Sequence, residues 1–259
     1  MIKPVLHYFN LADEVVSFST TRHGGVSKGK LATLNINPHR GDEPSAVAEN
    51  LQAVAAEIGV QADKVIRLHQ IHETHCLTVT DAFLNLSAAE QYEMEEGKDA
   101  VVTDCRNVCI GVHTADCVPL LFYDPVHHAI GAAHAGWRGT VQRIAQHTLR
   151  KMTELYGTDP KELKAVVGPC ISLKNFEVGQ EVYDAFSAAG FPMERIARMY
   201  EKWHINLPLC NQLQLEELGV PAANILQSGI CTYDNASDFF SARILKEGFG
   251  TIYTGIALK

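Results

Sequence analysis

The chain contains two short apolar segments joined by a polar turn, and this pattern constrains its fold more than any other. Residues 117–123 and 129–135 have the length and composition of strands, and Asp124 and Pro125 open the link between them. Aspartate and proline both favour turns, because aspartate bonds nearby backbone groups and proline fixes φ. We therefore predict a β-hairpin at this place in the chain.

Strands and helices are interspersed through the rest of the sequence. We predict helices at residues 43–58, 140–156, 180–189 and 208–218, where apolar residues recur at helical spacing or polar and apolar residues mix. We predict strands at residues 15–20, 65–80, 100–103, 108–112, 163–167 and 251–258, and loop with short helix at residues 82–97. Several neighbouring strands are expected to be antiparallel, which favours a mixed α/β (α+β) sandwich over a doubly wound parallel sheet.

The composition is that of an ordinary globular protein. The chain has 259 residues, 46% of them hydrophobic, and a formal net charge of −8. This length suits one large domain or two small ones. The chain has no basic tail, so nothing in it suggests a nucleic-acid partner. No apolar run approaches the ~20 residues of a membrane span. The seven cysteines match no secreted disulfide scaffold and the N-terminus matches no signal peptide, so we expect a cytoplasmic protein.

Cys117 and His134 lie on the two predicted strands of the hairpin. If the turn is centred near Val126, the two residues are at a similar level on adjacent strands, where β-carbons are ~5 Å apart. They could then share a metal ion or a proton. A slip of one residue would place them on opposite faces, and a buried cysteine with a hydrogen-bonded core histidine is the alternative. His127 and His128, in the turn, are expected to be exposed.

A histidine-rich segment at residues 68–75 is a second candidate. It resembles the zinc-helix pattern H-E-x-x-H, but its spacing is wrong and its flanks favour a strand. In a strand His72 points one way and the other two histidines of the segment point the other, so at most one or two of them belong to a single site. His72, Cys117 and His134 together would supply the ligands of a catalytic zinc with an open fourth position.

Two loops carry an arginine next to glycines. Residues 136–140 include Arg138 and lead into a predicted helix, and the loop after the first predicted strand includes Arg22. Free backbone N–H groups at a helix start attract anions, and an arginine adds a fork suited to phosphate or carboxylate. The alternatives are an ordinary strand-to-helix turn and a solvated loop. The two loops together indicate an anion pocket.

Nine motifs now carry a family resemblance: TTRHGGVS, LN, QIH, DAVVTD, TADCVPLL, AAHAGWRGT, GPCI, FEVG and FFSAR, in this order from about Phe18 to Leu258. In them the chain resembles the YfiH/YlmD family, also known as the laccase-domain or polyphenol oxidase family. The resemblance implies one catalytic domain over residues 1–259. It also implies a four-layer sandwich, with two central mixed β-sheets flanked by helices, similar to the catalytic domain of a deamidating bacterial toxin.

The resemblance further implies a purine nucleoside enzyme. Such an enzyme phosphorolyses adenosine, inosine and methylthioadenosine, deaminates adenosine, and binds zinc through residues that match His72, Cys117 and His134. These three are the expected catalytic residues, and Asp116 could orient water or shuttle a proton. The partners implied are a purine nucleoside and inorganic phosphate. The expected substrate or phosphate contacts are Arg22, Asn35, Arg138, Ser241 and Arg243.

One motif departs from the family pattern. The family usually has F-F-S-Y-R-R and a later T-G-R, whereas this chain has FFSARI and no later arginine, although Ser241 and Arg243 match. Two alternative functions stay open beside the nucleoside enzyme. One is a copper-dependent polyphenol oxidase, although the twelve histidines include no H-x-H pair. The other is a metal-free hydrolase with Cys117 as nucleophile and His134 as base. A monomer and a homodimer are both compatible with the sequence.

Overall fold

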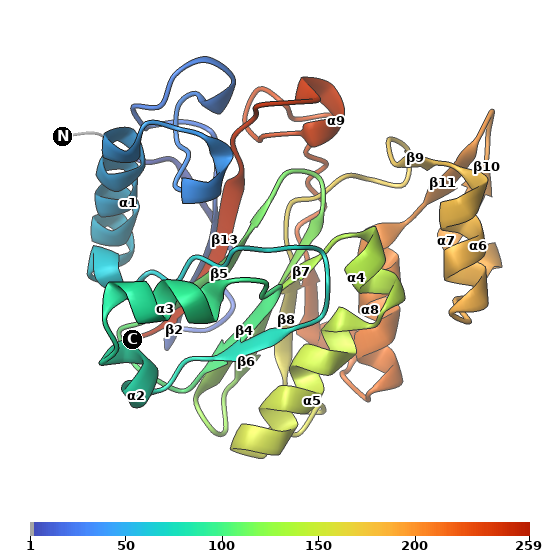
Figure 1. The fold of residues 1–259 in the computed structure, drawn as a ribbon. Coiled ribbons are helices and arrows are strands. Elements are labelled where there is room, and N and C mark those ends of the chain that lie inside the picture. Colours follow the sequence, from blue (N-terminus) through green and yellow to red (C-terminus); the bar gives the residue numbers. More distant parts are fainter. Residues whose placement is uncertain (1–2) are drawn as a thin grey trace.

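The computed structural model describes residues 3–259, which form two β-sheets packed face to face, with helices on the outer sides (Figure 1). The larger sheet has six strands, in the order β12 (Ile225–Gln227), β8 (Lys164–Val167), β6 (Val118–Asp124), β7 (Ala129–Ala135), β4 (Ala100–Thr103) and β3 (Cys76–Thr78). The smaller sheet has four, in the order β1 (Leu6–Tyr8), β2 (Val15–Thr20), β13 (Ile252–Leu258) and β5 (Cys109–Thr114). Apolar side chains from the facing strands form one core between the sheets.

Helices on both sides complete four layers. The buried residues of α1 (Pro44–Ile58), such as Leu51 and Val54, pack against Phe18 of the smaller sheet. α5 (Ile144–Tyr156) and α8 (Leu207–Glu217) cover the outer face of the larger sheet. The predicted mixed α/β, four-layer sandwich is therefore confirmed. The larger sheet is mixed, because β3 pairs in parallel with β4 and β12 with β8, whereas the smaller sheet is antiparallel throughout.

The predicted hairpin forms the centre of the larger sheet. β6 and β7 are antiparallel, and every residue of both strands is buried, which explains why both are apolar apart from Asp124 and His134. Pro119 is opposite His134, so Cys117, two residues earlier, lies on the same face of the sheet. Cys117 and His134 are therefore diagonal neighbours, and the register keeps both side chains on one side.

The extended segment predicted at residues 65–80 is a strand only at β3. The residues before β3 form single bridges at Val65 and His69, with η3 (Ala62–Lys64) ahead of them. His72 has a φ of 67°, in the left-handed region and outside the region of regular strands. The segment is instead a loop, because its backbone N–H groups bond to a buried carboxylate described below.

The helix predicted at residues 140–156 is two helices. α4 (Trp137–Val141) begins directly after β7, and α5 begins after Arg143, whose φ of 65° interrupts the helical path. The other predicted helices correspond to α1, α6 (Gln180–Ala188) and α8. A third, small sheet of β9 (Glu177–Val178), β11 (Trp203–Ile205) and β10 (Ala197–Met199) was not predicted; it lies beside α6 and α7 (Met193–Ile196) at one end of the molecule (Figure 1).

Short elements make up the remainder. Residues 82–97 contain loop and short helices, as predicted, and the second of these helices begins with a capping box of Ser87 and Glu90. The short elements are α2 (Asp81–Leu84), α3 (Ala88–Glu95), η1 (Gly29–Leu31), η2 (Pro38–Arg40), η4 (Ala222–Asn224) and α9 (Ala242–Leu245). Across residues 3–259, no helix is both long and apolar enough to pass through a lipid bilayer.

Gly111 in β5 allows the smaller sheet to pack closely around Tyr253. A β-carbon at this position would lie 2.5 Å from the carbonyl oxygen of Thr254 and 2.5 Å from Cζ of Tyr253. Gly111→Ala should therefore lower the free energy of unfolding by about 1–3 kcal/mol, the usual cost of overpacking. In the control Gly131→Ala, the new β-carbon would meet the flexible Met152 side chain at 3.0 Å. Urea denaturation should show the larger loss for Gly111→Ala; equal losses would contradict this account.

Candidate metal centre and its pocket

The structure brings together the three residues predicted to bind a metal. The potential ligand atoms of His72, Cys117 and His134 all lie within 4.8 Å of one another. Cys117 Sγ is 4.0 Å from His72 Nε2, and the two imidazole rings meet edge to face with centroids 4.7 Å apart. His134 is buried, Cys117 is half-buried and His72 is exposed. We call these three residues the trio.

Asp99 holds two members of the trio in place. Its Oδ1 accepts a hydrogen bond from His134 Nδ1 at 2.7 Å, which leaves His134 Nε2 free to face the other two residues. The same carboxylate accepts three consecutive backbone N–H groups, those of Ile71, His72 and Glu73, at 2.9–3.1 Å. These bonds account for the left-handed backbone at His72, because the loop must curl to aim all three donors at one group.

Electrostatics at the trio favour a thiolate. Burial alone would raise the pKa of Cys117, but His134 and His72 outweigh it and lower that pKa to about 6. Burial alone would lower the pKa of His134, but Cys117 and Asp99 raise it to about 9. Burial would likewise raise the pKa of Asp99, yet the hydrogen bonds from His134 and the backbone lower it. A thiolate is the form of cysteine that binds metal ions.

The trio therefore suits a metal ion by its chemistry. It offers one thiolate and two imidazole nitrogens, a set that binds zinc or copper, and a carboxylate behind one histidine fixes the ring as in many metal sites. Gly136 makes the close approach possible. A β-carbon there would lie 2.9 Å from His72 Cδ2 and 3.2 Å from Cys117 Sγ. Any larger residue would push the ligands apart.

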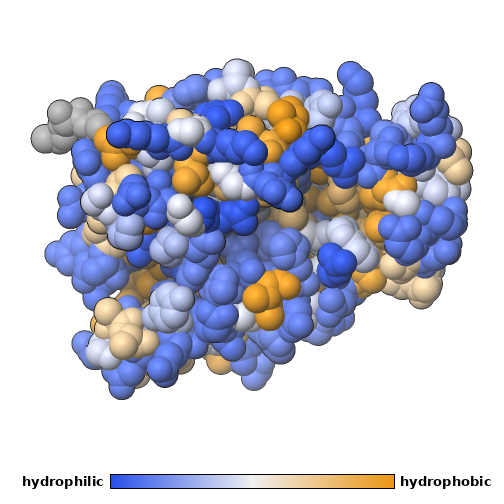
Figure 2. Space-filling model, turned by 45° about the horizontal axis from the view of Figure 1, so that its top comes forward, coloured by the Kyte–Doolittle hydropathy of each residue, from blue (hydrophilic) through white to orange (hydrophobic). Residues whose placement is uncertain are grey.

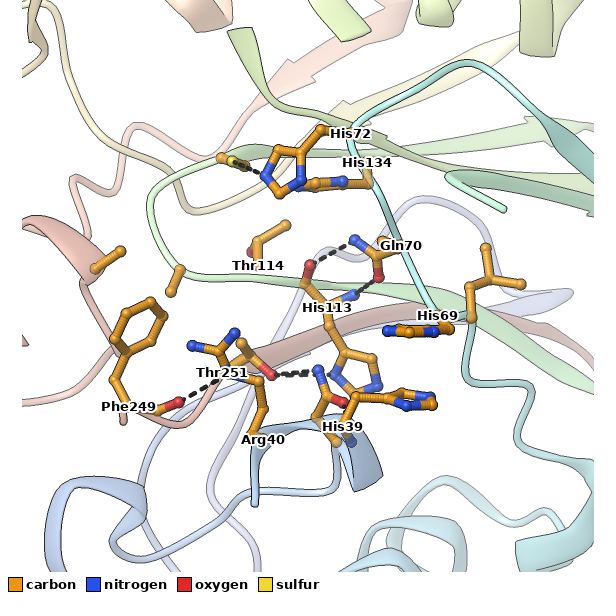
Figure 3. Close-up of a pocket in the computed structure, with 15 residues that line it drawn as sticks. His39, Arg40, His69, Gln70, His72, His113, Thr114, His134, Phe249 and Thr251 are labelled. Atoms are coloured by element: carbon orange, nitrogen blue, oxygen red, sulfur yellow. Dashed lines mark hydrogen bonds between the residues drawn. The ribbon is translucent and has the colours of Figure 1, made fainter. Parts of the chain in front are cut away.

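A cavity of about 250 Å³ opens beside the trio. His72 and His134 lie together at one end of it (Figure 3). The opposite end carries Arg40, Phe249 and Thr251, as well as the stacked rings of His39 and His69, whose centroids are 4.0 Å apart. Gln70, His113 and Thr114 lie between the two ends. The surface above the sheets is mostly hydrophilic, with a hollow near the centre of the view in Figure 2.

Two of the residues predicted to contact substrate bond to neighbouring loops instead. The Arg22 guanidinium donates to the carbonyl oxygens of Ala32 and Ala236 at 3.1 and 2.9 Å and stacks on Phe240. Asn35 is fully buried; its amide donates to Asp42 and accepts a bond from the Thr251 N–H. Neither side chain lines the cavity. Arg22 and Asn35 thus hold neighbouring loops together.

Asp116 is likewise bound within the protein. Its carboxylate accepts from the hydroxyls of Thr232 and Ser241, at 2.7 and 3.0 Å, and from the backbone N–H of Arg243 at 2.7 Å. Ser241 is fully buried, and the exposed Arg243 side chain donates to the Glu177 carbonyl. Of this loop, Ala242 lines the cavity, whereas Ser241 and Arg243 do not. The structure therefore places Asp116 where it positions the loop.

Arg138 lies at the start of α4, exposed, with its guanidinium 4.3 Å from the ring of Trp137. It does not line the cavity. The arginine that does is Arg40, which sequence reasoning missed. Its signal was present: Pro38, His39 and Arg40 form a basic turn before a glycine. The exposure predicted for His127 and His128 is confirmed.

The chain belongs to the family described as multi-copper polyphenol oxidoreductase laccase, whose model matches residues 16–259. A Bacteroides thetaiotaomicron relative named purine nucleoside phosphorylase is 41% identical, over 99% of this chain and 97% of the relative. A relative from an unknown prokaryotic organism, named adenosine deaminase RL5, is 35% identical over 98% of each. The crystal structure of Bacillus licheniformis YfiH matches with a TM-score of 0.91 and 30% identity, over 99% and 97% of the two chains. The predicted family membership is confirmed.

Removing the Asp99 charge should weaken metal binding. In Asp99→Asn the amide cannot accept from all four donors, so the affinity for Zn²⁺ should fall about 10–100-fold, the usual cost of losing such a support. Asp124→Asn is the matched control, because Asp124 also accepts from a histidine ring and from backbone N–H groups, but in the β6–β7 turn. Competition titration with a chromophoric chelator should show a loss for Asp99→Asn alone. Equal affinities in the two variants would refute the supporting role.

Proposed function

We propose that the chain is a zinc-dependent purine nucleoside phosphorylase that also deaminates adenosine. Its substrates are adenosine, inosine and methylthioadenosine, together with inorganic phosphate. The observation that carries the proposal is the convergence of His72, Cys117 and His134 at one end of a cavity, in a chain with relatives of both enzyme names. We further infer that residues 1–259 act as one catalytic domain in the cytoplasm, as a monomer or a homodimer.

Phosphorolysis requires a positioned nucleophile, the phosphate ion. An oxygen of hydrogen phosphate bonds to C1′ of the pentose while the bond from C1′ to the base nitrogen breaks, and the proton of the phosphate ends on the base. Positive charge develops at C1′, so holding the anion in place lowers the barrier. Zinc bound by the trio would polarise the substrate, or activate water for deamination. Asp99 serves both reactions by keeping the proton of His134 on Nδ1.

The ligands of the trio suit a single-zinc enzyme better than a multi-copper oxidase. The family description favours a second candidate, a copper-dependent polyphenol oxidase. Reduction of oxygen to water takes four electrons and therefore several coppers, whereas residues 3–259 contain one cluster of three or more potential ligands, the trio. A third hypothesis, a metal-free hydrolase with Cys117 as nucleophile, draws on the lowered pKa of that thiol. Metal content and oxygen uptake separate the three.

Five of the other predicted site residues hold loops in this proposal. Asp116, Ser241 and Arg243 act indirectly, by holding the loop whose Ala242 lines the cavity. Arg22 and Asn35 support neighbouring loops in the same way. The phosphate contact expected of Arg138 stays a prediction.

Cys117→Ala should abolish both base release and deamination, because it removes the one thiolate of the trio. The variant should also lose its zinc, while its circular dichroism spectrum and melting temperature stay close to those of the wild type. Cys105→Ala is the control, since Cys105 is a half-buried thiol that bonds to Asp81 and the Val79 carbonyl, away from the cavity. Full activity in zinc-free Cys117→Ala would show that the trio is not the site.

Phosphate should separate the two reactions. Adenine release from adenosine should rise with phosphate concentration, whereas inosine formation should continue without phosphate, because its nucleophile is water. Chelation of zinc should stop both reactions, and added Zn²⁺ should restore them. Chromatography of adenine, inosine and hypoxanthine from one assay follows all products together. If chelation stops adenine release and leaves inosine formation at its full rate, the two activities do not share the metal.

A further inference from the structure

Arg40, at the end of the cavity opposite the trio, is fixed and has free donors. Its Nε donates to the carbonyl oxygen of Phe249 at 3.0 Å, and its guanidinium lies 4.3 Å from the Phe249 ring. Among residues 3–259, its two Nη groups have no hydrogen-bond partner. In Figure 3 they point from the wall into the cavity. The planar fork is therefore held ready for a ligand with paired acceptor oxygens.

A hydrogen-bond chain next to Arg40 orients a further donor. Asn37 Oδ1 accepts the backbone N–H of His39, so the Asn37 amide nitrogen must face Thr251, whose hydroxyl it reaches at 3.3 Å. The Thr251 hydroxyl can then donate its proton to His113 Nδ1, also at 3.3 Å. This arrangement puts the proton of the neutral His113 ring on Nε2. The Nε2 atom is buried and has no partner within the described chain.

Thr114 adds another unused polar group. Its hydroxyl is buried, has no hydrogen-bond partner among residues 3–259, and belongs to a residue that lines the cavity. Buried polar groups without partners cost stability, so each of these two needs an explanation. His113 and Thr114 are consecutive in β5, so their side chains leave opposite faces of the strand, and both residues line the cavity. Arg40, His113 and Thr114 offer donors from different directions, an arrangement suited to a tetrahedral oxyanion.

Arg40 and Arg67 carry the positive charge near this end of the cavity, and His113 and His39 beside them are kept neutral. Burial lowers the pKa of His113 far below its usual range, and Arg67, His39, His134 and Arg40 lower it further. Burial also lowers the pKa of His39, with a further contribution from His69, while Glu96 opposes it. Glu96 is itself paired with His69 at 2.6 Å. A bound anion would pair with the charge of Arg40.

We propose that this end of the cavity binds the phosphate that attacks the nucleoside, with the fork of Arg40 as its anchor and the side chains of His113 and Thr114 as further contacts. The inference rests on the proposed function for the identity of the anion. It competes with the phosphate contact predicted for Arg138, and the two are separated by the variants below. It also orders the cavity: phosphate at the Arg40 end, the trio at the other, and the nucleoside between them.

Two substitutions of Arg40 test the anchor. Arg40→Met removes charge and fork, and Arg40→Lys keeps the charge alone. The KM for phosphate in adenine release should rise about ten- to hundredfold in Arg40→Met and less in Arg40→Lys. Zinc content, KM for adenosine and phosphate-free inosine formation should change by less than about twofold. Arg150→Met, on the exposed side of α5, is the matched control and should behave as the wild type.

The wild-type protein provides a test that does not depend on a variant folding. Phenylglyoxal modifies accessible arginines, and peptide mass spectrometry reports each site. Inorganic phosphate should protect Arg40 and leave Arg150 reactive. Protection by adenosine 5′-monophosphate without protection by inorganic phosphate would assign the site to a nucleotide and overturn the proposal.

Other outcomes are equally decisive. Unchanged phosphate dependence in folded Arg40→Met overturns the proposal, and so does a loss of phosphate affinity in Arg138→Met alone. If the wild type releases no base from any purine nucleoside, the proposed function fails. Protection of Arg40 by inorganic phosphate would then still establish the oxyanion site by itself, and absence of protection would remove it.

Discussion

One buried carboxylate connects the fold of this protein to its site. Asp99 directly precedes β4, is fully buried, and accepts bonds from His134 and from the backbone of residues 71–73. A buried charge that loses its partners destabilises the protein by several kcal/mol, so the loop stays bound to the carboxylate. His72 is thereby held against two residues of a distant hairpin. The trio depends on a side chain that does not line the cavity.

Buried polar groups support the other walls in the same way. Asp116 accepts from three donors within residues 232–243, and Asn35 and Arg22 tie the N-terminal loops to each other and to that segment. Because these groups are satisfied within the protein, few polar atoms are left to meet a substrate. In the proposed function, selectivity rests on the groups that stay free, such as the fork of Arg40.

The sequence predicts the parts of this fold that depend on local pattern. The hairpin and α1 follow from apolar periodicity and turn residues, and the four-layer arrangement is what the family resemblance implies. The loop at His72 could not be predicted as a loop, because its left-handed backbone is held by hydrogen bonds to Asp99, which lies far away in the sequence. Arg40 was missed for a related reason. Which arginine faces the cavity is decided by its contact with Phe249, more than two hundred positions away, and not by neighbouring glycines.

The position of β13 has a consequence for how the molecule is made. This strand lies between β2 and β5, so the two earlier strands have no partner in common until residues 252–258 have left the ribosome. The cavity wall formed by Ala242, Phe249 and Thr251 arrives at the same moment. Pairings between such distant segments form slowly and expose sheet edges meanwhile. A nascent chain can therefore assemble the hairpin and its cysteine early, yet it has no closed pocket until this late strand is inserted.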